Sequence, residues 1–107
     1  MAVRYNSGKL RHDLVPLNAQ EEYVKVLTKG IEKYEERNWE KGMPWNWVIA
    51  SLKRHLHAFE KGEDIDSESG CLHIAHVMCN AAFLAEYAYT HPELDNRPSK
   101  LFPNKEV

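Results

Sequence analysis

The chain has 107 residues and a mass of 12.5 kDa, which fit a single domain over residues 1–107 and exclude a large multidomain enzyme. A hydrophobic fraction of 43% is enough to build one core and excludes a wholly disordered chain. The formal net charge of -2 provides no overall attraction to nucleic acid or to an anionic membrane, so we expect neither as a partner.

The sequence also predicts a cytoplasmic protein. Its longest apolar runs, such as Ala81 to Ala85, are far shorter than the roughly twenty residues that span a bilayer. The first residues are polar and lack the apolar region of a secretory signal. Cys71 and Cys79 fall on one predicted helix, too far apart to bridge each other, so we expect reduced thiols that fill the core.

Apolar residues at helical spacing predict a first helix over residues 17–36, with charged residues on its other face. The segment before it, residues 1–16, shows no periodicity and is expected to be extended. A second helix begins after Pro44, a residue suited to a first helical turn, and keeps its apolar period until Gly62. A polar, acidic connection follows it.

A third helix is predicted from about residue 70 to residue 90, and it is apolar almost all round, which indicates a buried helix. The helical core therefore spans residues 17–91, and residues 92–107 are expected to form an extended tail. The predicted fold is all-α, a small antiparallel bundle of three main helices. Because so short a chain cannot surround a buried helix, we expect a homodimer or larger homo-oligomer to complete the core.

The third helix carries a polar stripe, which needs an explanation because unpaired polar groups in a core are costly. His73, His76 and Asn80 share one helix face, with Ser69 one turn earlier. Two imidazoles on one face suit a divalent metal ion, or an anion when both rings are protonated. The alternative is that each is a core histidine whose hydrogen bonds are satisfied.

The second helix and the acidic connection carry groups that could complete such a site. Arg54 and His55 lie on or beside the apolar face, and a partly buried arginine needs a carboxylate or phosphate partner. The connection supplies oxygen ligands able to hold Mg²⁺ or Mn²⁺ bridged to phosphates, namely Glu63, Asp64, Asp66 and Glu68. A structural ion pair for the arginine and a solvated charge run for the carboxylates are the alternatives.

Two further segments contain residues suited to substrate binding. Asn38 and Trp39 place an amide beside an aromatic ring, on which a base could stack while the amide contacts its edge. Lys9 and Arg11 could clamp a phosphate if the N-terminal segment folds over the site. Tryptophan as core filling and an ordinary basic pair are the alternatives.

Several linked motifs occur in order along the chain: Gly8-Lys-Leu-Arg-His-Asp-Leu, Lys33-Tyr followed by Arg37-Asn-Trp-Glu-Lys-Gly, Arg54-His, Gly62-Glu-Asp-Ile-Asp-Ser-Glu-Ser-Gly, and His73-x-x-His-x-x-x-Asn-x-x-Phe-Leu. Together they resemble the phage-associated dATP/dGTP diphosphohydrolase family over about residues 7–90. The resemblance implies a small phage protein of the host cytoplasm, related to the all-α, MazG-like nucleotide pyrophosphohydrolases. Such enzymes convert a deoxynucleoside triphosphate to the monophosphate and pyrophosphate.

The sequence departs from the MazG-like pattern, which holds Mg²⁺ with two pairs of acids. Arg54 and His57 stand where the first pair is expected, and His73 and His76 stand at the second. Together with the spacing, the resemblance implies that His73, His76 and either Asp66 or Glu68 hold a divalent metal, Mn²⁺ or Mg²⁺ first and Zn²⁺ next, which activates a water.

The same considerations predict roles for the remaining candidates. Glu63 or Glu68 would act as the general base, and His55 would stabilise charge on the phosphate oxygens. The predicted ligands of the substrate, a purine deoxynucleotide or a related nucleotide, are Lys9, Arg11, Asn38, Trp39, Arg54 and Asn80.

Two other functions stay open at the level of sequence. The cationic, aromatic pocket could sequester a nucleotide without cleaving it and so blunt nucleotide signalling in the host, which the departure from paired acids favours. Alternatively, the stripe of His and Asn residues is a hydrogen-bond network that fixes subunit register in a purely structural adaptor.

Overall fold

The structure is a computed structural model and describes residues 1–101. Over this range it contains three main helices and no β-strand, which confirms the all-α prediction. The main helices are α1 (Leu17–Gly30), α2 (Trp45–Glu60) and α3 (His73–Thr90). Four shorter helical segments are η1 (His12–Leu14), η2 (Asn38–Lys41), η3 (Pro92–Leu94) and α4 (Pro98–Leu101). No helix in this part of the chain is long and apolar enough to cross a membrane.

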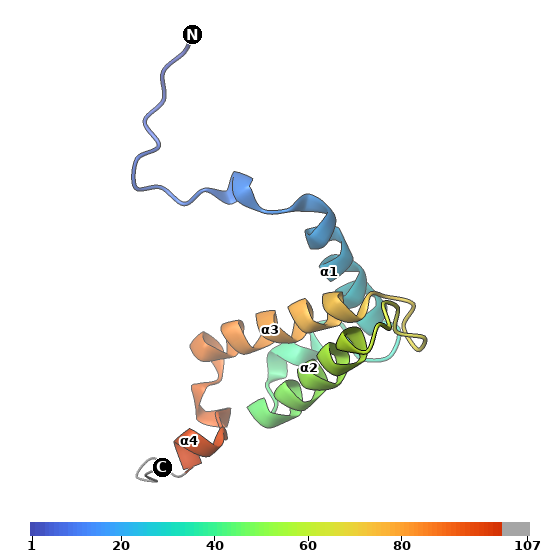
Figure 1. Cartoon of the computed structure of the whole chain (residues 1–107). Helices are drawn as coiled ribbons and strands as arrows, with labels where there is room; N and C mark the ends of the chain where they lie inside the picture. The colour runs from blue at the N-terminus through green and yellow to red at the C-terminus, as the bar shows by residue number, and fades with distance from the viewer. Residues whose placement is uncertain (102–107) are drawn as a thin grey trace.

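Helix α3 is the central element of the fold. Figure 1 shows α2 and α3 side by side. The end of α1 lies beside the beginning of α3, and the start of α1 lies away from the other two helices. Two buried clusters lie along α3. The cluster facing α1 contains Val26, Cys71, Ala75 and Cys79, and the cluster facing α2 contains Trp45, Val48 and Tyr87.

The second cluster holds the chain segments that flank α2. The ring of Trp39 stacks on Phe83 with 4.6 Å between ring centroids, and the Trp39 carbonyl accepts a hydrogen bond from the hydroxyl of fully buried Tyr87. The indole of Trp45 donates to the carbonyl of His91, 3.1 Å away. These contacts attach η2 to α3, and the end of α3 to the start of α2.

The structure shifts two of the predicted helix boundaries. The first helix ends at Gly30 instead of residue 36, because the Gly30 carbonyl accepts from the amides of both Lys33 and Tyr34 and the chain tightens into turns. The third helix begins at His73, because Leu72 is extended and forms an isolated antiparallel bridge with Ile65. Cys71 therefore precedes α3, and both cysteines are buried free thiols.

Helix α3 is also less enclosed than its composition predicts. Ala81, Ala85 and Tyr89 are exposed in the single chain, because α1 and α2 cover only part of the helix surface. The segment after residue 91, expected to be extended, contains η3 and α4. Its Asn96 side chain accepts from the Asn46 amide at 2.9 Å, so it folds against the start of α2. Residues 102–107 of the predicted tail lie outside the described residues.

Two glycines allow the contribution of close packing to be separated from that of backbone strain. Gly42 and Gly62 both have φ near +90°, which disfavours any residue with a Cβ. We expect Gly62→Ala to cost about 1 kcal/mol of unfolding free energy from strain alone. Gly42→Ala should cost roughly 2–4 kcal/mol, because its Cβ would lie 2.8 Å from Leu94 Cδ1 and 2.9 Å from the His91 ring. Urea unfolding followed by circular dichroism measures both, and equal costs would contradict the close contact.

Candidate functional site

The side-by-side packing of α2 and α3 brings three imidazoles together, and we call His55, His73 and His76 the histidine cluster. The Nδ1 atoms of His55 and His73 are 2.9 Å apart. The His55 ring also stacks on that of His76, with centroids 4.1 Å apart and planes within 4°. His73 is only 6% exposed, so the cluster lies in the seam between the helices.

The connection between α2 and α3 folds back over this seam. The turn begins at Gly62, whose φ is +92°, and the Glu63 amide donates to the Ala58 carbonyl at 3.0 Å. The Asp64 carbonyl then accepts from the first amide of α3, that of His73, at 2.8 Å. These backbone bonds carry the side chains of Glu63 and Asp66 to the histidine cluster.

One line of hydrogen bonds joins Glu63, His73 and His55. The Glu63 carboxylate lies 3.2 Å from His73 Nε2, and a carboxylate only accepts, so His73 donates from Nε2. In a neutral His73 the Nδ1 atom is then the acceptor, so His55 donates from its own Nδ1. The remaining nitrogen of a neutral His55, Nε2, carries a lone pair with no hydrogen-bond partner among the described residues.

Burial lowers the pKa of His55, and the neighbouring His76 lowers it further. The pKa of His76 is lowered as well, chiefly by burial, although Asp66 acts in the opposite direction. Both shifts favour neutral rings at pH 7. The seam therefore holds imidazoles that can accept a proton. The alternative in which two protonated rings bind an anion is disfavoured.

A second line of hydrogen bonds joins Asp66, Ser69 and His76. The Ser69 hydroxyl lies 2.7 Å from both Asp66 Oδ2 and His76 Nε2, and it accepts from the Cys71 amide at 3.2 Å. Burial would raise the pKa of Asp66, but the hydrogen bonds from Ser69 outweigh it and the pKa lies below its usual value. The ionised Asp66 thus accepts from Ser69, and Ser69 accepts from His76. All hydrogen-bonding positions of Ser69 are used, which makes it an anchor for His76 and not a nucleophile.

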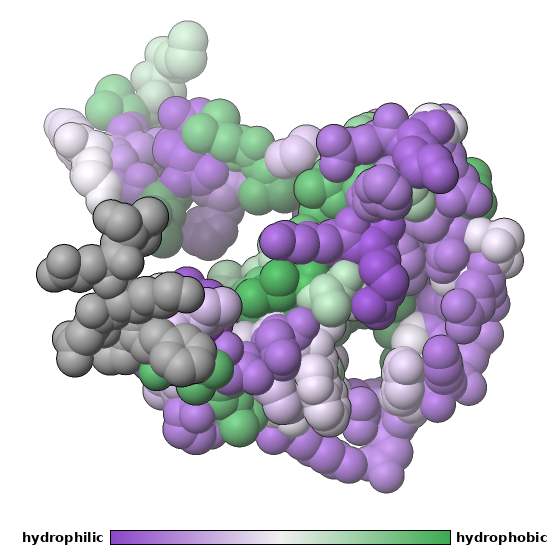
Figure 2. Space-filling view, turned by 60° about the horizontal axis from the view of Figure 1, so that its bottom comes forward, coloured by the Kyte–Doolittle hydropathy of each residue, from purple (hydrophilic) through white to green (hydrophobic). Residues whose placement is uncertain are grey.

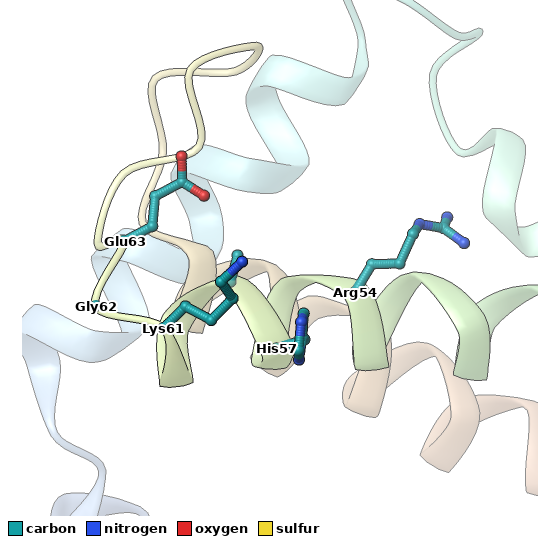
Figure 3. A pocket seen from close by; sticks show the side chains of 6 residues that line it. Arg54, His57, Lys61, Gly62 and Glu63 are labelled. Carbon is teal, nitrogen blue, oxygen red and sulfur yellow. The ribbon is translucent and has the colours of Figure 1, made fainter.

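An open pocket of about 460 Å³ adjoins the cluster along α2. Figure 3 shows Arg54 and His57 projecting from α2, Lys61 at the residue that follows the helix, and Glu63 on the connection beyond it. These three basic side chains are at positions i, i+3 and i+7, so they lie on one helix face. Glu63 lines this pocket and also bonds His73, which connects the pocket to the histidine cluster.

The other predicted residues have different surroundings. Asn80 spans the seam, donating to the His76 carbonyl at 3.0 Å and to Ser51 Oγ at 3.3 Å. Glu68 is exposed and pairs with Lys33 at 3.3 Å, and its charge acts on His76, whose pKa it raises. Trp39 belongs to the core cluster described above, with one ring face covered by Phe83.

The N-terminal and η2 candidates are not brought to the histidine cluster within one chain. Figure 1 shows the segment that carries Lys9 and Arg11 leaving the start of α1 in the direction away from α2 and α3. Arg11 forms a two-bond fork with Asp13, at 2.8 and 2.7 Å, within that segment. Asn38 begins η2, and its backbone N–H donates to the Glu35 carbonyl.

The predicted metal ligands His73, His76 and Asp66 do not converge on a common point. Within residues 1–101, no three His, Cys, Asp or Glu side chains are arranged to hold a metal ion. Both ring nitrogens of His73 have hydrogen-bond partners, and His76 Nε2 faces Ser69. The metal site stays a prediction, and no step proposed below passes through it.

The sequence interpretation did not assign a role to Lys61 or to the hydroxyl of Ser51. Lys61 could have been found from its spacing, because it continues the series of Arg54 and His57 on one face of the second helix. Ser51 gives no such signal, since only the packing of α2 against α3 brings its hydroxyl to Asn80.

Comparison with known proteins agrees with the motifs. Residues 2–97 match the family described as dATP/dGTP diphosphohydrolase, N-terminal. The chain belongs to this family. It is 30% identical over 95 residues to a dATP/dGTP diphosphohydrolase of Salmonella phage PMBT28, an alignment that covers 89% of this chain. The chain spans about a third of that relative, since the alignment covers 32% of its length. No solved structure matches the chain significantly.

The protonation of the cluster can be tested residue by residue. We expect NMR titration of the ring protons to place His55 and His76 below the ordinary histidine pKa of about 6.5, and His91, which bonds the Glu40 carbonyl, above it. Unfolded histidines bind protons near pH 6.5 while folded His55 and His76 stay neutral, so these two groups lower stability as the pH falls from 7 to 5. His91 contributes with the opposite sign. Titration of His55 above 6.5 would contradict the tautomers assigned here.

Proposed function

We propose that this protein is a nucleotide pyrophosphohydrolase that converts dATP, dGTP or a closely related nucleoside triphosphate to the monophosphate and pyrophosphate. The substrate class follows from the description of its family. The observation that carries the proposal is the line of hydrogen bonds from His55 through His73 to Glu63, because Glu63 also lines the basic pocket.

The pocket on α2 suits a chain of phosphates. Arg54 offers a planar fork for two phosphate oxygens, and Lys61 adds a second full charge at the other end of the helix face. His57 lies between them. In the proposed complex these groups bind the β- and γ-phosphates and stabilise the charge of the departing pyrophosphate.

The seam supplies the base. His55 Nε2 takes a proton from a water as that water attacks the α-phosphorus, and the bond from the α-phosphorus to the bridging oxygen breaks to release pyrophosphate. The resulting imidazolium is stabilised through His73 by the Glu63 carboxylate. His55 is thus the proposed catalytic base, while His73 and Glu63 position it. This differs from the role of direct base predicted for Glu63 or Glu68.

A Mg²⁺ or Mn²⁺ ion that accompanies the triphosphate would neutralise phosphate charge. Asp64 and Glu68 of the connection are exposed carboxylates, a ligand type that suits such a cation. The predicted ligand set of His73, His76 and Asp66 would instead require their present hydrogen bonds to be exchanged for metal bonds.

A second candidate function is sequestration of an intact nucleotide. The observation that favours it is the basic face of Arg54, His57 and Lys61, which binds phosphates whether or not a water is activated. In either case we propose a homo-oligomer, because the surface of α3 is incompletely covered in one chain.

The two functions are separated by chromatography of the products. We expect dATP and dGTP to be converted to monophosphate and pyrophosphate with Mg²⁺ or Mn²⁺, and EDTA to stop turnover because the substrate is the metal complex. In parallel, isothermal titration with the same nucleotides measures binding. Tight binding with every nucleotide recovered intact would contradict hydrolysis and support sequestration. Absence of binding would contradict both proposed functions.

Adjacent basic residues on α2 provide a matched pair of variants. We expect Arg54→Ala to raise the KM for the triphosphate about tenfold or more, since it removes a phosphate ligand of the pocket. Lys53→Ala, which removes a charge of the same sign from a side chain outside the pocket lining, should change KM less than twofold. Steady-state kinetics measure the KM of both variants. Equal increases in KM would show that Arg54 acts only through its net charge.

The proposed base is tested by His55→Asn. General-base catalysis typically contributes 10²–10⁴-fold, so we expect kcat to fall by about that factor while KM changes little. The acidic limb of the pH–rate profile, which reports the pKa of the base, should disappear as well. Circular dichroism and thermal unfolding establish that the variant is folded, and an unchanged kcat would overturn this assignment.

A further inference from the structure

Residues 1–16, which we call the N-terminal arm, have local structure but stand apart from the helical body. The Lys9 amide donates to the Asn6 carbonyl and the Leu14 amide to the Arg11 carbonyl, both at 3.1 Å. All hydrogen bonds described for the arm end within it or at the start of α1. In Figure 1 the arm extends away from α2 and α3, so the rest of the chain does not hold it.

The arm and the first residue of α1 expose an unusual amount of apolar surface for an isolated segment. In this part of the chain, the most exposed large apolar side chains after Met1 are Val3 at 78%, Tyr5 at 84%, Leu10 at 84%, Leu14 at 69% and Leu17 at 75%. In Figure 2 green, apolar surface is visible on the part of the molecule that projects at the upper left. The radius of gyration is 17.3 Å, against about 13 Å for a compact chain of this length. Exposed apolar side chains on an extended segment indicate a surface that contacts another molecule.

A complementary surface lies at the opposite end of α1. The connection at residues 61–72 has four carboxylates and one lysine, whereas the arm has three basic residues and one acid. Apolar side chains flank the connection, since Phe59 is 40% exposed and Ile65 is 49% exposed. The connection therefore offers both negative charge and apolar surface to a segment with positive charge and apolar side chains.

The arm and the connection of one chain are far apart. The ion pair of Lys33 with Glu68 places the connection beside the chain that follows α1, whereas the arm precedes α1. Fourteen helical residues separate them by about 21 Å, and the arm points away. An arm of this length spans up to about 50 Å when extended, which is enough to reach a neighbouring molecule.

We propose that the N-terminal arm lies across the acidic connection of a second copy of this chain and delivers Lys9 to that copy's phosphate pocket. Leu10 and Leu14 pack against Phe59 and Ile65 of the second copy. Lys9, whose side chain has no hydrogen-bond or salt-bridge partner among the described residues, reaches the pocket of Arg54 and Lys61. Each complete site is then built from two copies, an inference that rests on the proposed function for the role of Lys9 but not for the docking itself.

Mixed cysteine variants test the docking without any activity. Leu10→Cys chains are mixed with Ile65→Cys chains under mild oxidation, and we expect a disulfide-linked dimer on a non-reducing gel. Tyr89→Cys, at a position 88% exposed near the far end of α3, replaces Ile65→Cys as the control and should give much less of this dimer. The native Cys71 and Cys79 are buried. No dimer, or equal amounts with both partners, overturns the proposal.

A chain carrying both Leu10→Cys and Ile65→Cys distinguishes docking between copies from docking within one chain. We expect its disulfide-linked product to have at least twice the mass of the chain. A monomer with an internal disulfide would overturn the proposal in favour of an arm that folds back. Light scattering of Leu10→Asp/Leu14→Asp, with circular dichroism to establish intact helices, should show loss of the assembly. An unchanged mass would contradict the apolar contact.

Complementation then tests the role of Lys9. We expect Lys9→Ala to lower turnover about tenfold, and His55→Asn to lower it by at least about a hundredfold. Refolding the two together should restore about a quarter of wild-type turnover or more, because some sites then combine an intact arm with an intact His55. No recovery, or an unaffected Lys9→Ala, overturns delivery of Lys9. If wild-type protein hydrolyses no nucleotide while the cysteine dimer forms, the proposed function fails and the docking stands.

Discussion

The site depends on one constraint, which is that imidazoles placed inside an apolar helix packing must find hydrogen-bond partners. His73 is nearly buried on α3, and both of its ring nitrogens are satisfied, by His55 of α2 and Glu63 of the connection. Ser69 and Asp66 serve His76 in the same way. No buried side-chain nitrogen or oxygen in residues 1–101 lacks a partner. The register of α2 on α3 and the fold of the connection therefore support one another, since a shift of either would leave buried polar groups unpaired.

Two side chains with different chemical roles, a cationic phosphate ligand and a neutral proton acceptor, occupy adjacent positions on α2. Arg54 and His55 are neighbours in the chain, but consecutive residues of a helix point about 100° apart. Arg54 thus lines the open basic pocket, while His55 turns into the seam, where burial favours its neutral form. A cationic surface for phosphates and a neutral proton acceptor lie side by side because one helix presents both faces to different surroundings.

Assembly follows from what the three helices leave uncovered. In residues 1–101, α1 and α2 make the main contacts with α3, and η2 and η3 add smaller ones. Tyr89 and the alanines of the outer surface of α3 stay exposed, and the N-terminal arm carries further apolar side chains away from the body. A core this small is marginal for an isolated chain of about a hundred residues.

The sequence alone determined the helical architecture and its approximate limits, because hydrophobic period, Pro44 and Gly62 are local signals that need no knowledge of neighbours. It also determined that the stripe of His73 and His76 is special, since polar groups on an apolar helix require an explanation. Only the tertiary structure decided which partners satisfy them. Spacing along one helix cannot reveal that His55 arrives from another helix, that Trp39 belongs to the core, or that Lys9 points away from the site of its own chain. Those relations arise from packing between segments distant in sequence, which each element's periodicity does not encode.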